Sequence, residues 1–127
     1  MVIHNNFPNF VLFLYIHMAL ADNHLHPLEE EVILGKMKKL FPNDHDHKKI
    51  FQQALAEYKS YNHEQVMNIV RSTFKQHTEV KFSQKYKVYT DMFDVINADG
   101  KVEESERIAL DALKEIIDIN AESKVGL

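Results

Sequence analysis

Four acidic residues occur at equivalent positions in two similar stretches of the chain. Asp22 and Glu29 lie in one stretch, and Asp99 and Glu106 lie in the other, which aligns on the first without a gap. In both stretches Ala-Asp is followed by Asn or Gly, then by an aliphatic residue three places after the Asp and a Glu seven places after it. Clustered carboxylates of this kind are typical ligands of hard cations such as Ca²⁺ and Mg²⁺. The repeat therefore predicts a divalent-cation site if the two stretches converge.

The same four acids also have a purely structural interpretation. An Asp in a tight turn can accept hydrogen bonds from nearby backbone amides, and a Glu in the first turn of a helix complements the helix dipole. Both features would recur in a duplicated fold without any ion. The aliphatic residues of the two loops, Leu25 and Val102, are expected to be buried under either interpretation, because they would pin each loop to the core.

The second stretch also partly matches the calcium-binding loop of an EF-hand. If Gly100 is the sixth loop residue, Asn97, Asp99 and Glu106 fall at the third, fifth and twelfth positions. The first position, where an Asp ligand is required, is occupied by Val95. A true EF-hand is therefore not favoured.

Histidines provide a second set of candidate ligands, but their spacing is unfavourable. Eight histidines are present, including those of the segment 44–47 and the pair His24 and His26 beside Asp22. No His-Glu-x-x-His pair occurs, and neighbours two apart on a helix do not face each other. A solvated helix start is predicted for 44–47, and His17, within an apolar segment, is predicted to be a hydrogen-bonded core residue.

Catalytic signatures are absent from the sequence. There is no cysteine nucleophile, no Gly-x-Ser-x-Gly elbow and no phosphate-binding glycine loop. The remaining acid-base candidates are carboxylates, which we expect to be mostly exposed and therefore poorly tuned for catalysis. The chain is accordingly predicted to be non-enzymatic.

Six helices are needed to position these residues, and no stretch alternates for long enough to predict a strand. Start and stop signals predict helices over 9–20, from Pro27 to before Pro42, after a cap at Asp44, after a capping box of Asn62 and Gln65, from Ser83, and over 103–119. On the fifth helix the inward stripe is predicted to be Tyr86, Tyr89, Met92, Phe93 and Ile96. The tail 121–127 is expected to be frayed.

Composition supports a single all-α domain. With 127 residues the chain fits one core, and three Gly and three Pro are too few for the turns of a β-sandwich. A net charge of −4 argues against nucleic acid as a partner. The apolar run 10–16 is too short to span a bilayer, so we interpret it as a buried helix rather than a membrane or signal segment. The lack of cysteine suits a cytoplasmic location.

The repeated pattern Ala-Asp-Gly-x-Val-x-x-x-Glu, followed each time by an aliphatic helix, resembles the TerB-like family of tellurite-resistance proteins. The resemblance implies one compact helical domain over 1–127 with pseudo-twofold symmetry. It also implies that Asp22, Glu29, Asp99 and Glu106 are the candidate metal ligands. The first copy departs from the pattern by Asn23 in place of glycine and by the inserted histidines and proline that follow it.

Three functions compete, and the resemblance implies the first of them. The first is a TerB-like accessory domain in a tellurite, metal or stress response, which binds a divalent cation or a protein partner, with a homo-oligomer as one form of partner. The second is a structural helical interaction module with no bound ion. The third is a metal-assisted hydrolase, which is disfavoured because no nucleophile or phosphate cradle accompanies the acids.

Overall fold

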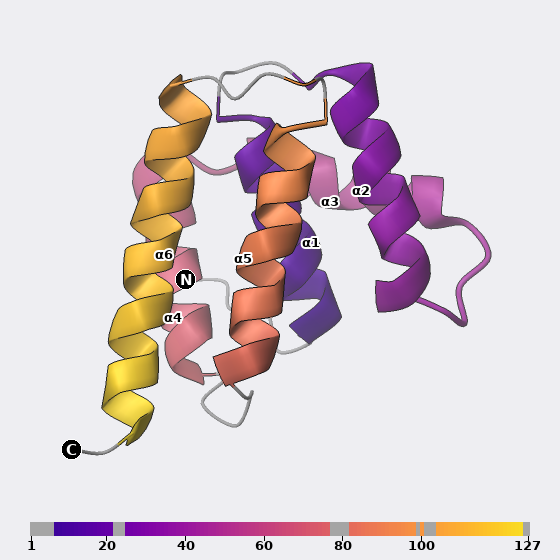
Figure 1. Cartoon of the computed structure of the whole chain (residues 1–127). Helices are drawn as coiled ribbons and strands as arrows, with labels where there is room; N and C mark the ends of the chain where they lie inside the picture. The colour runs from indigo at the N-terminus through magenta and orange to yellow at the C-terminus, as the bar shows by residue number, and fades with distance from the viewer. Residues whose placement is uncertain (1–6, 22–24, 77–81, 99, 101–103, 126–127) are drawn as a thin grey trace.

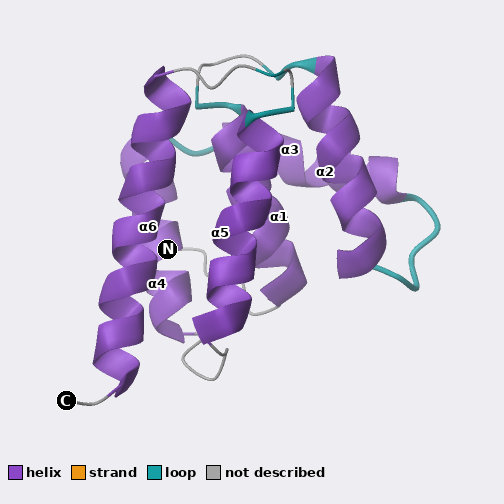
Figure 2. Cartoon of the chain, in the orientation of Figure 1, coloured by secondary structure: helices purple, strands orange, loops and turns teal. Residues whose placement is uncertain are grey.

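The computed structural model describes the backbone of residues 7–21, 25–76, 82–98, 100 and 104–125, and side chains within 8–21, 25–73, 87–98, 100 and 104–114. Its six helices are α1 (Phe7–Ala19), α2 (Pro27–Leu40), α3 (His47–Lys59), α4 (His63–Gln76), α5 (Phe82–Ile96) and α6 (Glu104–Val125). Figure 2 shows no strand in the described part of the chain. The predicted all-α fold is confirmed.

The helices that flank the two acidic stretches form two antiparallel pairs. In Figure 1, α1 and α5 both end at the top of the molecule, and α2 and α6 both start there and run back down. Helices α3 and α4 lie behind these pairs. The fold therefore brings the starts of α2 and α6 to the same end of the molecule.

Helix α1 is the centre of the core. Every residue from Phe10 to Ala19 is buried, and the helix packs against α2, α3, α5 and α6. A helix that is apolar on all sides is stable in water only when neighbours cover it completely. The interpretation of 10–16 as a buried helix is confirmed, and no described helix is long and apolar enough to cross a membrane.

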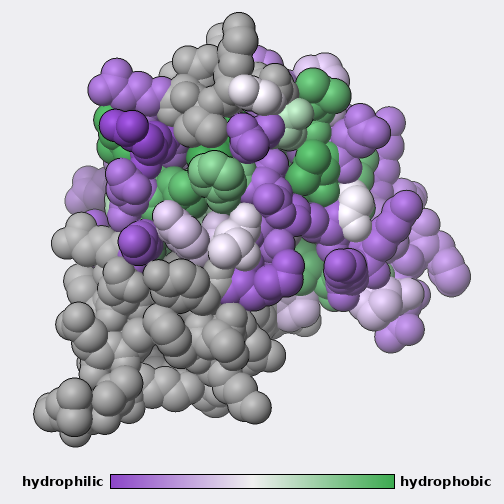
Figure 3. Space-filling model, in the orientation of Figure 1, coloured by the Kyte–Doolittle hydropathy of each residue, from purple (hydrophilic) through white to green (hydrophobic). Residues whose placement is uncertain are grey.

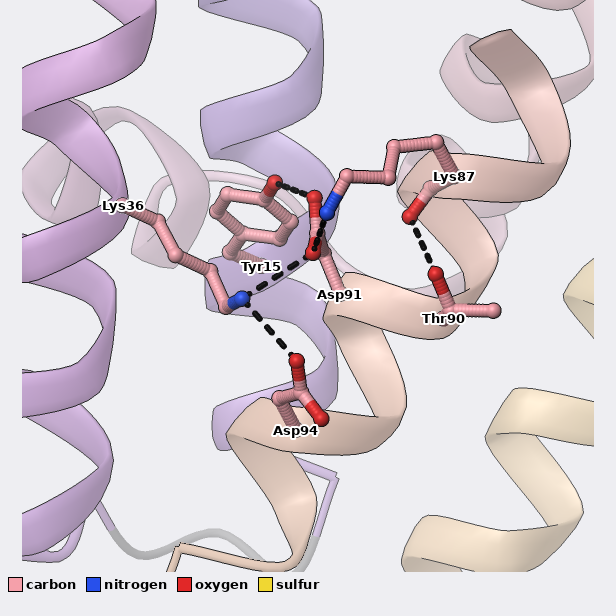
Figure 4. Close-up of polar contacts among 6 residues, drawn as sticks. All are labelled: Tyr15, Lys36, Lys87, Thr90, Asp91 and Asp94. Carbon is pink, nitrogen blue, oxygen red and sulfur yellow. Dashed lines mark hydrogen bonds and ion pairs between the residues drawn. The ribbon is translucent and has the colours of Figure 1, made fainter. Parts of the chain in front are cut away.

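The phenol of Tyr15 on α1 is paired across the core with a carboxylate of α5. Its hydroxyl donates to Asp91 Oδ2 at 3.1 Å, and Asp91 Oδ1 accepts from Lys36 Nζ of α2 at 3.0 Å and from Lys87 Nζ at 2.8 Å (Figure 4). Lys36 also donates to Asp94 Oδ2 at 3.1 Å. Burial opposes ionisation of Asp91, but the two lysines outweigh it and hold the pKa of this carboxyl below its ordinary value.

A second buried polar side chain of α1, that of His17, is paired with α3. Its Nδ1 lies 2.8 Å from the hydroxyl of Tyr58, and the imidazole is buried. The prediction of a hydrogen-bonded core histidine is confirmed.

The capping residue at the start of α4 agrees with the prediction, whereas the one at the start of α3 does not. The capping box of α4 is confirmed, because Asn62 N donates to Gln65 Oε1 at 2.9 Å and Gln65 N donates to Asn62 Oδ1 at 2.8 Å. The predicted cap of α3 at Asp44 is wrong. Asp46 caps this helix instead, since its Oδ1 accepts from Lys49 N at 3.0 Å.

The core-facing side of α5 also differs from the predicted stripe. Within the described side chains of this helix, Met92 and Ile96 are buried and Tyr89 packs partly buried against the core, as predicted. Phe93 is instead 45% exposed, and Val88 and Val95 are buried. Tyr86 lies outside the described side chains. Phe93 and the two valines all have helical spacing to the confirmed positions, so periodicity alone could not choose between them. Helix α6 continues to Val125 rather than ending near residue 119, and so includes most of the tail predicted to be frayed.

The pairing of Tyr15 with Asp91 leads to a stability prediction. Replacing Asp91 with Ala should lower the free energy of unfolding by about 1–3 kcal/mol, because the buried phenol loses its acceptor and Lys36 loses a partner. Lys87→Ala should cost less than about 1 kcal/mol, since this lysine is largely exposed. Urea denaturation of both variants measures the difference. Equal losses would show that the phenol does not depend on this carboxylate.

Candidate functional site

Two of the four predicted ligands meet inside the molecule. Glu29 is the third residue of α2 and Glu106 the third residue of α6, so they occupy the same place in the two helices. Their residues are only 1% and 2% exposed, and their carboxyl groups share a hydrogen bond. The expectation that the carboxylates are mostly exposed is wrong for this pair.

Glu29 also has a local structural task at the start of α2. Its Oε1 accepts a hydrogen bond from the backbone amide of His26 at 3.0 Å, and Pro27 occupies the first helical position. A glutamate at the third position commonly reaches back to the residue before the helix in this way. The helix-start role predicted for this glutamate therefore accounts for one of its hydrogen bonds.

The electrostatics of the pair favour a single negative charge. The pKa of Glu29 is raised to about 8, chiefly by burial. The hydrogen bond and the charge of Glu106 also raise this pKa, while the backbone amide and the charge of His26 lower it. Two carboxylates in contact cannot both ionise unless a positive charge compensates them. The pair must hold either a shared proton or a cation.

The rest of the predicted ligand set is not placed. Asp22 and Asp99 lie outside the described residues, as does Val102. Leu25 is partly buried and packs against the core, in agreement with its predicted role. Within the described ranges, no group of three or more acidic or histidine side chains is arranged to hold a metal. Because the two loops fall largely outside the described ranges, the internal duplication stays a prediction.

One alternative ligand set has a structural explanation, whereas His24 of the other lies outside the described residues. In the segment 44–47, Asp46 caps α3 and Nε2 of His47 lies 2.8 Å from the carbonyl oxygen of Phe41. Both side chains are therefore engaged at a helix start, as predicted for this segment. Val95, at the position of the first EF-hand ligand, is fully buried within α5. The EF-hand geometry is thus excluded at its first position.

The acid pair should make the stability of the ion-free protein depend on pH. The folded state keeps a proton up to about pH 8, whereas an unfolded glutamate loses it near its ordinary value of 4.5. The folded state thus binds more protons between these values, and the free energy of unfolding should fall as the pH rises through them. In Glu106→Gln the amide can donate to Glu29 in place of the proton, so this decline should be smaller. Denaturation with a chelator present, at several values between about pH 5 and 9, measures both slopes.

Glu104→Gln is the matched control for this measurement, because Glu104 is exposed in the same turn of α6. It should retain the wild-type slope. Identical slopes in wild type and Glu106→Gln would show that the two glutamates do not share a proton.

Comparison with known protein families gives a match that covers nearly the whole chain. The family model described as tellurite resistance protein TerB matches residues 10–125, which include all six helices except the first residues of α1. No curated protein and no solved structure is significantly similar to the chain. The match covers far more than half of the sequence, and the chain therefore belongs to the TerB family of tellurite-resistance proteins.

Proposed function

We propose that the chain is a non-catalytic accessory domain that binds one divalent cation, Ca²⁺ or Mg²⁺, in a tellurite, metal or stress response. The observation that supports the cation is the meeting of Glu29 and Glu106 in the interior. The two acids come from equivalent positions of separate helices, and each helix presents the positive end of its dipole there. A buried pair of like charges is costly to keep unless a ligand or a proton compensates it.

The donor set is suited to a hard cation. Carboxylate oxygens are the preferred ligands of Ca²⁺ and Mg²⁺, and the chain has no cysteine to favour a softer metal. Glu29 and Glu106 would be two ligands, and Asp22 and Asp99, which precede the same two helices in sequence, would supply the others. When bound, the ion would neutralise the pair and hold the starts of α2 and α6 together.

The hydrolase alternative gains no support from the two cavities formed by described residues. The cavity of about 510 Å³ beside α4 and the one of about 200 Å³ beside α3 have neither glutamate among their described lining residues. A substrate in either cavity would therefore not contact the acid pair.

The second candidate, an interaction module with no ion, is favoured by hydrophobic side chains at the surface. Leu28, Phe93 and Ile108 are all large and exposed. Figure 3 shows hydrophobic areas among the hydrophilic residues of the upper, described part of the surface. Under this alternative the glutamates serve only to cap α2 and to share a proton.

Ion titration separates the two candidates. If the site exists, CaCl₂ or MgCl₂ should bind with a stoichiometry of about one per chain and raise the thermal midpoint, because a ligand at one hundred times its dissociation constant stabilises the folded state by about 2.7 kcal/mol. Glu106→Gln and Asp99→Asn keep the side-chain shape but lose a charge, so both should abolish the shift. Calorimetric titration and thermal melting provide the readouts.

Glu31→Gln is the matched control, since Glu31 is exposed on α2 two positions from Glu29. It should respond to the ions as the wild type does. NaCl at equal ionic strength controls for screening. If the divalent salts act no more strongly than NaCl, or if all variants respond equally, the cation site is disproved and the interaction module remains.

A further inference from the structure

A cavity separate from the acid pair lies between the ends of α1 and α3, the first turns of α4 and one side of α6. Its volume is about 510 Å³. Sites for small organic molecules typically measure roughly 300–1,000 Å³ and combine an apolar lining with a few polar groups. The size of this cavity therefore suits a small molecule.

One wall of the cavity is polar and held in place by the core. Tyr58 and His17 line it and pair with each other at 2.8 Å. The ring of Phe13 packs against Tyr58 at 5.3 Å and against Tyr61, which also lines the cavity, at 6.4 Å. A wall fixed before binding loses little entropy when a ligand arrives.

This wall is uncharged at neutral pH. Burial, and then the charge of His63, lowers the pKa of His17 to about 4. Burial raises the pKa of Tyr58 to about 12. The pair therefore offers hydrogen-bonding groups without a charge.

The rest of the described lining is largely apolar and has room. It includes Leu20, Met67 and three residues of α6, namely Ile108, Ala109 and Ala112. The two alanines leave space where larger side chains would fill it, and Ile108 is 61% exposed. Burying these side chains against an apolar ligand would contribute favourable free energy.

The mouth of the cavity has basic groups. Lys59, at the end of α3, and His63, at the start of α4, are among the lining residues. No aspartate or glutamate occurs among the described residues of the lining, although the chain has 19 acidic residues and a net charge of −4. Glu57 lies next to the cavity, because its Oε1 accepts from the hydroxyl of Tyr61 at 3.3 Å, but it does not line the cavity. The ammonium group of Lys59 in the lining itself therefore favours an anionic ligand over a cationic one.

We propose that this cavity binds a small organic anion with an aromatic or branched aliphatic body, such as an aromatic carboxylate. The body packs between the tyrosines and the alanines of α6, and the anionic group lies at the mouth beside Lys59 and His63. Neither group belongs to the acid pair, so the anion site has no ligand in common with the proposed cation site.

Fluorescence and calorimetric titration with 8-anilinonaphthalene-1-sulfonate, an aromatic anion, test the site in the full chain with a chelator present. The wild type should bind about one molecule per chain. Ala112→Phe fills the cavity and should weaken binding about tenfold or more, and Lys59→Gln, an exposed substitution that leaves the fold intact, should weaken it about three- to tenfold. N-phenyl-1-naphthylamine, which lacks the sulfonate, should bind wild type and Lys59→Gln equally.

Lys48→Gln is the matched control, because Lys48 is exposed on the same helix and does not line the cavity. It should bind the anion as the wild type does. Absence of binding, or binding that is unchanged in both Ala112→Phe and Lys59→Gln, would overturn the proposal. Equal losses in Lys48→Gln and Lys59→Gln would also overturn it, because they would show attraction to overall charge rather than to the mouth of this cavity.

Discussion

The burial of α1 from Phe10 to Ala19 is the constraint on which the rest of the structure depends. Its two buried polar side chains are shielded from water, so the phenol of Tyr15 and the imidazole of His17 need hydrogen-bond partners within the protein. Asp91 of α5 accepts the hydrogen bond of the phenol, and the hydroxyl of Tyr58 on α3 pairs with the imidazole. Because Asp91 also accepts from Lys36, α2 is tied to α5 by the same carboxylate. These contacts fix the positions of α2, α3 and α5 relative to α1. They therefore help to place the start of α2 near the start of α6.

The contact between Glu29 and Glu106 follows from that arrangement. By itself this contact destabilises the folded state. Helix starts attract negative charge, which explains a glutamate at the third position of each helix. Two such glutamates in one buried place repel each other, and burial adds to the cost of ionising them. A protein that only needed to cap α2 could have kept Glu29 with an uncharged partner. The second acid is the feature that a cation would explain.

Helix α6 is shared by the two proposed sites. Ser105 lines the cavity, while the next residue, Glu106, belongs to the acid pair. Ile108, Ala109 and Ala112 continue along the cavity side, and Leu110 and Leu113 face the core. One helix therefore presents three different surfaces within its first turns. Its position matters to the core, to the acids and to the cavity together.

The sequence by itself determined the helical class, the approximate extent of most helices, the core character of 10–16 and the equivalence of Glu29 and Glu106, because periodicity, caps and repeats are local patterns. It misplaced the cap of α3 and turned Phe93 inward, since neighbouring candidates satisfied the same local rule. The burial of the two glutamates was decided only by the tertiary structure. They are far apart in the chain, and their contact depends on how α1 and α5 pack. The cavity likewise has no local signal, because its walls come from four helices that only the fold brings together.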